Sequence, residues 1–247
     1  MTGTAAGANG LYGESDRQGL STGNPEIDRR LADGLPLGSL TLIEGENDTG
    51  KSVISQQIIW GAMKAGLSVD IYSSENTPRS FLSQMESMNL DISDYFAWGY
   101  LRLFPLHTSG LFWTGEEMKA LLQRTVDHIK KSPSQVVVID SLTLLTEFAS
   151  HHDVLSFLTS CKSLVDEGRT ILITLHTYSY EEETLVRLRS ICDAHLLMKK
   201  ALVGDKYVMV MEAVKVRGAR KTTGNVVSFE VHPGYGMKVI PISMAKV

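Results

Sequence analysis

The chain has 247 residues, of which 43% are apolar, so it can bury one sizeable core and we expect one domain rather than two. Its 24 basic and 28 acidic residues give a formal net charge of −4, which argues against the overall positive charge of proteins that bind duplex nucleic acid. The two cysteines, Cys161 and Cys192, lie in apolar segments, which favours core thiols in a reducing compartment over a disulfide framework.

The first 20 residues are small and polar, and we expect them to form a flexible tail ahead of a single domain over residues 21–247. This segment has neither the basic region nor the apolar region of a signal peptide. No stretch of the chain reaches the roughly 20 apolar residues that a membrane helix needs. We therefore expect a cytoplasmic protein that is peripheral to a membrane only through its partners.

Alternating helix and strand signals follow the tail. Asn24-Pro25-Glu26 has the residue types of a helix start, and Gly34 is expected to end that short helix. Residues 39–44 predict a strand, residues 53–63 carry apolar side chains at helical spacing, and residues 68–74 predict a second strand. This order of strand, loop, helix and strand is that of a parallel sheet covered by helices on both faces.

The alternation continues to residue 174 and then changes. The elements expected there are a helix from Thr77, a strand over 100–106, a helix from the capping box at Thr114 to about Lys131, a strand over 136–139, a helix over 153–167 and a strand over 170–174. From residue 194 only strands are expected, over 195–199, 207–214, 226–231 and 237–240. The sequence therefore predicts an α/β fold whose mostly parallel, twisted sheet ends in antiparallel hairpins.

Residues 45–52 read Gly-Glu-Asn-Asp-Thr-Gly-Lys-Ser, which matches the P-loop (Walker A) pattern between a predicted strand and a predicted helix. In such a loop the backbone N–H groups wrap the β-phosphate, the lysine reaches the β and γ oxygens, and the hydroxyl binds Mg²⁺. The sequence thus predicts a site for ATP and Mg²⁺. The residues expected to bind the nucleotide are Gly45, Asn47, Asp48, Thr49, Gly50, Lys51, Ser52 and Val53.

Two carboxylates in the loop call for an explanation, because they lie near an expected polyanion. Asp48 can serve where the backbone needs a left-handed conformation, which Asn and Asp tolerate best after glycine. Whether the side chains of Glu46 and Asp48 point into water is not decided by the sequence.

Polar residues at the carboxyl ends of the strands are the next candidates, because ligands of open α/β sheets bind there. Asp140 follows the apolar strand over 136–139 in the Walker B arrangement and is expected to hold Mg²⁺ together with Ser52. The alternative is an aspartate that caps the next turn. Glu75 follows the strand over 68–74 and is a candidate base that polarises water; the alternative is a charge ahead of the helix at Thr77.

Three further residues are candidates with open alternatives. His176, or Thr174 before it, is placed to sense the γ-phosphate by hydrogen bonding, and a structural histidine is the equal alternative. Lys215 and Arg217 alternate along a strand, share one face and are candidate contacts to a neighbouring subunit's nucleotide. The alternative is a solvated basic edge that blunts strand pairing.

The order of these motifs resembles the KaiC branch of the RecA superfamily. The resemblance rests on residues 23–28, 38–45, the P-loop, Asp140-Ser-Leu-Thr143 and Lys215-Val-Arg-Gly218. Residues 174–178, 189–195, 215–237 and 240–243 are similar, more narrowly, to the FlaH family of archaellum accessory ATPases. The resemblance covers about residues 21–247 and leaves out only the tail.

The resemblance implies a RecA-like core that binds ATP, assembles as a ring and docks on the motor ATPase FlaI beneath the membrane platform, within a FlaX or FlaC/D/E scaffold. It implies Lys51 and Ser52 as the phosphate and Mg²⁺ ligands, Asp140 as the Walker B acid, and Lys215 and Arg217 as contacts across a subunit interface. Nucleotide state would then regulate assembly, and no nucleic acid is expected as a partner.

One position departs from the family pattern. Many KaiC-type ATPases carry two adjacent glutamates after the second core strand, whereas Asn76 follows Glu75 here. We therefore expect ATP binding with slow or absent hydrolysis. An active KaiC-like ATPase or autokinase, with Glu75 as its base, is the alternative.

Overall fold

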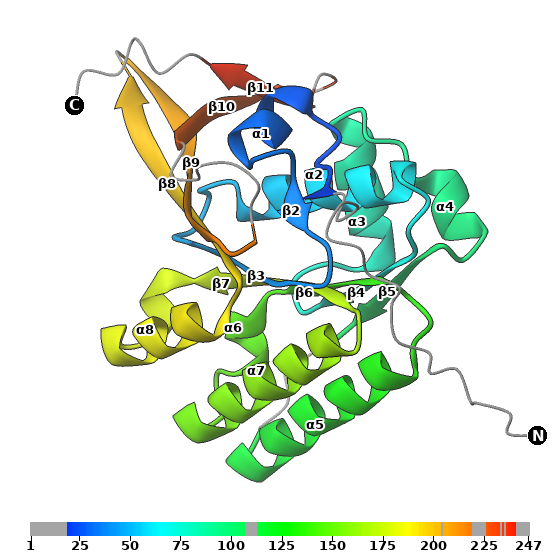
Figure 1. Ribbon diagram of the computed structural model, residues 1–247, viewed down its shortest axis with the longest axis vertical. Coiled ribbons are helices and arrows are strands. Elements are labelled where there is room, and N and C mark those ends of the chain that lie inside the picture. The colour runs from blue at the N-terminus through cyan, green and yellow to red at the C-terminus, as the bar shows by residue number, and fades with distance from the viewer. Residues whose placement is uncertain are drawn as a thin grey trace, which may run out of the picture.

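The computed structural model describes residues 19–106, 113–203, 205–218, 226–232, 234 and 236–240. Within these residues one sheet of nine strands, in the order β11-β10-β9-β8-β3-β7-β6-β4-β5, runs through the molecule with helices on both faces (Figure 1). The strands are β3 (Leu40–Gly45), β4 (Val69–Ser73), β5 (Leu101–Pro105), β6 (Val136–Asp140), β7 (Thr170–His176), β8 (Ala194–Val203), β9 (Lys206–Val216), β10 (Val226–His232) and β11 (Gly236–Ile240).

The sheet is parallel from β8 through β5 and antiparallel from β8 through β11. This confirms the predicted fold class. The antiparallel strands follow one another along the chain, whereas each parallel strand after β3 is reached through a helix.

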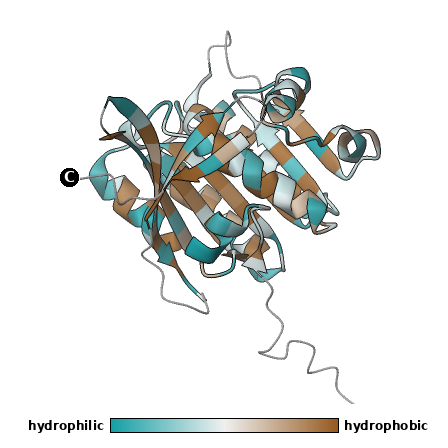
Figure 2. Ribbon diagram, turned by 90° about the horizontal axis from the view of Figure 1, so that it is seen from above, coloured by the Kyte–Doolittle hydropathy of each residue, from teal (hydrophilic) through white to brown (hydrophobic). Residues whose placement is uncertain are grey.

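The helices form two layers, one on each face of the sheet (Figure 1). Their bounds are α1 (Pro25–Arg30), α2 (Lys51–Lys64), α3 (Pro78–Ser87), α4 (Ser93–Ala97), α5 (Gly115–Lys131), α6 (Leu142–Leu145), α7 (His151–Asp166) and α8 (Glu182–Ile191), with a 3₁₀ turn η1 (Thr177–Ser179). Alternate residues of β6 point to opposite faces of the sheet. Val136 and Val138 pack with the layer of α2 and α3, and Val137 and Ile139 pack with the layer of α5, α7 and α8. Apolar residues are accordingly concentrated in the strands, and polar residues lie on the outer helix surfaces (Figure 2).

The predicted helix starts are present with their capping bonds. Thr77 and Thr114 each form a reciprocal capping box, and Asn24 accepts hydrogen bonds from the backbone N–H groups of Glu26 and Ile27. The end of α1 differs from the prediction of a single Gly34 stop. The helix ends at Arg30, and Ala32, Asp33 and Gly34 follow with φ values of 60°, 75° and 113°, so three left-handed residues reverse the chain.

Two residues of the predicted tail, Gly19 and Leu20, belong to a strand. Gly19 and Leu20 form β1, which pairs with β2 (Leu35–Pro36), and the Leu20 side chain is buried. The apolar Leu20 is stabilised by burial in the core beside α2. The rest of the predicted tail, residues 1–18, lies outside the described residues.

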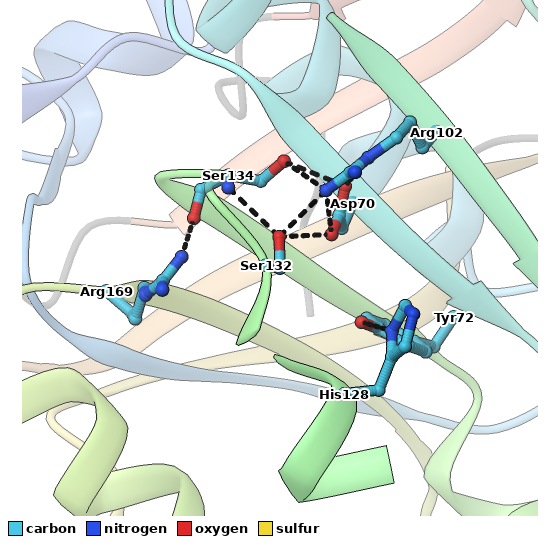
Figure 3. A network of polar contacts seen from close by, with 7 residues as sticks. All are labelled: Asp70, Tyr72, Arg102, His128, Ser132, Ser134 and Arg169. Atoms are coloured by element: carbon cyan, nitrogen blue, oxygen red, sulfur yellow. Dashed lines mark hydrogen bonds and ion pairs between the residues drawn. The ribbon is translucent and has the colours of Figure 1, made fainter. Parts of the chain in front are cut away.

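A network of polar contacts lies at the amino ends of β4 and β5 (Figure 3). The fully buried Asp70 accepts hydrogen bonds from Arg102 Nε (2.8 Å) and Nη2 (2.8 Å), Ser132 Oγ (2.6 Å) and Ser134 Oγ (2.8 Å). Arg169 donates to the Ser134 carbonyl oxygen. The network therefore ties β4 and β5 to the connection between α5 and β6.

Two other expectations concern cysteines and membranes. Cys161 and Cys192 are both buried free thiols, as predicted, and burial raises the pKa of each. No helix among the described residues is long and apolar enough to cross a lipid bilayer.

Candidate nucleotide site

The P-loop leaves the central strand β3 and enters α2 where glycine is required. A Cβ on Gly45 would lie 2.5 Å from the Met198 carbonyl oxygen, because β8 approaches β3 closely at this point. Gly50, the residue before α2, has φ of 90°, and no side chain caps the helix there. The first N–H groups of α2 are therefore left for another acceptor, which is the condition for anion binding at a helix start.

The two carboxylates of the loop point into solvent. Glu46 and Asp48 are both exposed, and Asp48 has the left-handed backbone expected from the sequence, with φ of 54°. Lys200 Nζ lies 3.7 Å from Asp48 Oδ2. Both side chains are thus open to solvent, which answers the question that the sequence left open, and Asp48 also borders the cavity beside the loop.

Lys51 is directed into the loop. Its Nζ donates a 2.6 Å hydrogen bond to the Glu46 carbonyl oxygen, and Thr49 Oγ1 donates to the same oxygen at 2.8 Å. Burial lowers the pKa of Lys51, and the carboxylates of Glu75 and Asp140 act in the opposite direction. The ammonium group is therefore poised beside the acidic residues at the neighbouring strand ends.

One cavity of about 590 Å³ collects residues from the P-loop and the start of α2, from the carboxyl ends of three strands and from β9. Its lining consists of Asn47, Asp48, Thr49, Gly50, Lys51, Ser52, Val53, Glu75, Asp140, His176 and Met209. All the predicted residues of the loop line it except Gly45, which starts the loop, and the three candidates from β4, β6 and β7 are present. The roles assigned to these residues toward a nucleotide stay predictions.

Asp140 is buried at the floor of the cavity. Burial raises the pKa of Asp140 to about 6, the carboxylate of Glu75 raises it as well, and a 2.6 Å hydrogen bond from Thr174 Oγ1 and the charge of Lys51 lower it. Thr174 is fully buried and held by Asp140, so it is not placed to sense a γ-phosphate. His176 is the one of the two alternatives that reaches the cavity.

His176 joins the cavity to the loop that follows β7. Burial lowers the pKa of His176, as does the charge of Lys51, whereas the carboxylate of Glu75 acts in the opposite direction. Its backbone N–H donates to Thr143 Oγ1 (2.9 Å), and its ring stacks on Tyr178 with centroids 5.4 Å apart. Tyr178 in turn donates to Asn47 Oδ1 of the P-loop at 3.3 Å.

Lys215 and Arg217 lie at the opposite end of the sheet. Val216 pairs with Ala194 at the start of β8, whereas the P-loop follows the end of β3, to which β8 runs parallel. Lys215 Nζ donates to the Arg189 carbonyl oxygen at 2.8 Å. Neither residue lines the cavity of its own chain. Among the described residues β10 pairs with β9 only over residues 209–212 of β9, so both the subunit contact and the basic sheet edge stay predictions.

The main contact that sequence reasoning missed is the ion pair of Glu44, the buried residue directly before the P-loop. It accepts hydrogen bonds from Arg189 Nε (2.8 Å) and Nη2 (2.6 Å), and His195 Nε2 lies 2.9 Å from it. Burial alone would raise the pKa of Glu44, but its contacts with Arg189 and His195 outweigh burial and hold it at about 2. The pair fixes the end of β3 against α8.

The residues fit a magnesium-bound nucleoside triphosphate. The open helix start and Lys51 offer positive partial and formal charge, and Ser52 and Asp140 offer the hard oxygen ligands that Mg²⁺ prefers. No group of three or more His, Cys, Asp or Glu side chains that could hold a metal alone occurs among the described residues. A cation here would therefore need phosphate oxygens or water to complete its coordination.

Comparison with known proteins gives matches along most of the chain. Residues 20–244 match the family model described as "ATPase: KaiC". The chain is 34% identical over 227 residues to the archaeal flagellar ATP-binding protein FlaH of Sulfolobus acidocaldarius, which covers 92% of this chain and 99% of that protein. It is 26% identical over 223 residues to FlaH of Methanocaldococcus jannaschii, with 89% and 94% covered. The crystal structure of the flagellar accessory protein FlaH from Methanocaldococcus jannaschii shares the fold, with a TM-score of 0.81 at 23% identity and coverage of 92% and 100%.

Proposed function

The chain belongs to the KaiC family of ATPases and, within it, to the archaeal flagellar ATP-binding proteins named FlaH, and on this premise we propose that it is a Mg-ATP-binding regulatory subunit of the archaellum motor. The observation that carries the proposal is the single cavity that joins the P-loop to Glu75, Asp140 and His176. Each of these groups suits one part of a bound Mg-triphosphate.

Within the proposed site each residue acts through its position. The backbone N–H groups from Gly50 onward and the Lys51 ammonium hold the β- and γ-phosphates, and Ser52 with Asp140 holds the cation. The cation, when bound, neutralises phosphate charge. Ionised Asp140 is favoured once a cation replaces water beside it, which offsets the burial that raises its pKa.

We further propose that the nucleotide state controls self-assembly and docking on the motor ATPase FlaI, at the cytoplasmic side of the membrane platform and within the FlaX or FlaC/D/E scaffold. Lys215 and Arg217 support assembly, because a nucleotide that they contact would have to belong to another copy of the chain. A ligand that binds one assembled state more tightly shifts the population toward that state. Turnover is expected to be slow, with Glu75 as the one glutamate available to activate water.

A second function, active ATP hydrolysis or self-phosphorylation, is favoured by one observation. Glu75 is exposed and lines the same cavity as Lys51 and Asp140, which is where a general base for an attacking hydroxyl or water would be needed. This activity would be lost on replacement of Glu75 by Gln.

A titration of Mg-ATP that follows both molecular mass and phosphate release tests the two functions. ATP-driven assembly without phosphate release or phosphoprotein supports the regulatory function, and release that depends on Glu75 supports the catalytic one. Lys51→Ala is expected to abolish binding. Lys64→Ala removes the same charge from the far end of α2 and is expected to behave as wild type. Equal responses of these two variants would contradict the site.

A further inference from the structure

The turn that leaves β4, residues 73–76, is held on one side by the turn that follows Asp140. Ser73 Oγ accepts hydrogen bonds from the backbone N–H groups of Glu75 (3.3 Å) and Asn76 (2.8 Å). Ser74 Oγ accepts from Ser141 N (3.1 Å) and donates to Ser141 O (3.1 Å). Hydrogen bonds thus hold the backbone beside Glu75 in a fixed position relative to the backbone beside Asp140.

A chain of side-chain amides, which we call the amide ladder, holds the other side of the turn. Asn76 is 8% exposed, and its Oδ1 accepts from Gln84 Nε2 at 2.8 Å and from Ser80 Oγ at 3.2 Å. Gln84 Oε1 accepts in turn from Gln56 Nε2 at 2.8 Å, and Gln56 is 4% exposed. The amide ladder consists of Gln56, Gln84 and Asn76, and it joins α2 to α3 and to the turn.

The ladder starts on the face of α2 that carries the expected Mg²⁺ ligand. Gln56 follows Ser52 by four residues, and side chains four apart lie one above the other on a helix. Ser52 and Glu75 both line the cavity, and the ladder is a direct side-chain connection between the helix of one and the turn of the other. These three amides therefore link the helix of the expected cation ligand to the turn that carries Glu75, in addition to the contacts of Ser74 with Ser141.

Adjacent residues of the turn face opposite ways. Glu75 is exposed and lines the cavity, and no hydrogen bond or ion pair ties its carboxylate to the described residues, whereas Asn76 is buried against α2 and α3. A second carboxylate at position 76 would lie between the helices and not among the phosphates. The exchange of glutamate for asparagine thus changes how the turn is held more than it changes the charge of the cavity.

We propose that Asn76 is a positioning residue that acts through Glu75: by accepting from Gln84, it holds the turn so that the Glu75 carboxylate faces the γ-phosphate end of the cavity. The proposal rests on the proposed function, because it assumes that the cavity binds Mg-ATP. Its consequence is a discrimination between ATP and ADP that depends on the ladder. A carboxylate opposite the γ-phosphate opposes ATP and leaves ADP nearly unaffected.

The test is the ratio of the Mg-ATP and Mg-ADP affinities, measured by calorimetry on the full chain. Glu75→Gln removes the like charge and is expected to raise the ratio of ATP to ADP affinity about tenfold. Asn76→Leu keeps the size of the side chain, loses the acceptor and releases the turn, so it is expected to raise the ratio about threefold to fivefold. Asn76→Asp keeps an oxygen that accepts from Gln84 and Ser80, and it is expected to stay within about twofold of wild type.

A surface variant breaks the same ladder without disturbing the core. Gln84 is exposed, and Gln84→Ala is expected to shift the ratio in the same direction as Asn76→Leu. The matched control is Gln123→Ala, an exposed helical glutamine whose amide bonds only to Asp127 of its own helix, which is expected to leave the ratio unchanged. Thermal unfolding without nucleotide reports whether each variant is folded.

A double-mutant cycle separates positioning from a merely structural role. In the Glu75→Gln background, Asn76→Leu is expected to add less than about twofold, because the ladder acts only through the Glu75 charge. The proposal is overturned if Asn76→Leu and Gln84→Ala keep the wild-type ratio, or if their full shift persists without the Glu75 charge. If the wild-type chain binds neither nucleotide, the proposed function fails as well, which distinguishes that failure from a failure of the ladder alone.

Discussion

Two buried aspartates at opposite ends of the sheet differ in how far the protein satisfies them. Asp70, at the amino end of β4, accepts four hydrogen bonds from Arg102, Ser132 and Ser134 (Figure 3). Asp140, at the carboxyl end of the neighbouring β6, accepts one side-chain hydrogen bond, and burial raises its pKa to about 6.

The difference agrees with a structural role for Asp70 and with the cation-binding role that we propose for Asp140. A buried charge that is fully paired holds its surroundings together, and removal of one partner is strongly destabilising. A buried charge with one donor is costly until a cation approaches it. We therefore expect substitutions at the two aspartates to act on different quantities, the free energy of unfolding at Asp70 and the affinity for Mg-ATP at Asp140.

The largest effect on stability is expected for Asp70→Asn. The variant leaves the Arg102 guanidinium without its counter-ion and weakens two serine contacts, so the free energy of unfolding should fall by about 4 kcal/mol. Urea denaturation measures this change. Asp127→Asn, on the exposed face of α5, is the control and should change it by less than about 0.5 kcal/mol. The affinity of the folded Asp70→Asn protein for Mg-ATP should match that of wild type. A large loss of this affinity would contradict the separate roles given to the two aspartates.

Glu44→Gln tests whether pairing or proximity to the P-loop decides which quantity a substitution changes, the free energy of unfolding or the affinity for Mg-ATP. Glu44 is suited to this test because it is fully paired yet lies next to the loop. The folded pKa of about 2 is below the usual 4.5, so the ion pair stabilises the protein fully above pH 4.5 and loses this effect as the pH falls from 4.5 to about 2. At pH 7 the free energy of unfolding of the variant should be about 3 kcal/mol lower than that of wild type. Denaturation curves at several pH values should show this difference shrinking below pH 4.5. A difference that stays constant down to pH 2 would contradict the assignment.

Asp140→Asn should act in the opposite way to Asp70→Asn. Loss of a charged ligand should weaken Mg-ATP binding by about 10-fold to 100-fold, which corresponds to about 1.5 to 3 kcal/mol. The free energy of unfolding without nucleotide should stay the same or rise slightly, because a costly buried charge is removed. Calorimetry and urea denaturation on the same protein give both numbers. A loss of stability as large as that of Asp70→Asn would show that the two acids serve one purpose.

The smallest effect is expected for Thr174→Val, a change of similar shape that removes the hydrogen bond to Asp140. The free energy of unfolding should fall by about 1 kcal/mol, and the pKa of Asp140 should rise further. Thr159→Val on the exposed face of α7 is the control. Nuclear magnetic resonance titration of the aspartate carboxyl carbons would report the pKa change, and an unchanged value would contradict the role given to Thr174.

The sequence predicts those elements whose signals are local. Thr114 and Glu117 cap α5 within one turn, and the helix spans the predicted residues because every cue lies in that segment. The helix α8 was not predicted. Its start has no side-chain cap, and the contact that anchors it, Arg189 with Glu44, joins residues 145 positions apart. The reversal after α1 was misjudged because Ala32 adopts a left-handed conformation, which an alanine does not indicate in the sequence.

The same reasoning separates the predicted and the missed parts of the site. Glu75, Asp140 and His176 gather at the cavity because parallel strands present their carboxyl ends at one edge. Met209 reaches the cavity through the register of the β8–β9 hairpin, and Tyr178 reaches the P-loop by stacking on His176, neither of which a linear pattern encodes. The exchange at Asn76 was interpreted as a lost charge because a sequence does not say which of two adjacent side chains faces the ligand.

The place of β3 in the sheet has a consequence for synthesis of the chain. β3 ends at Gly45, yet both of its neighbours in the sheet, β7 and β8, begin after residue 169. While the chain is still on the ribosome, the apolar strand that leads into the P-loop therefore has two open edges until more than 120 further residues have emerged. A chaperone that shields extended apolar segments would find its target in residues 40–45 during that interval.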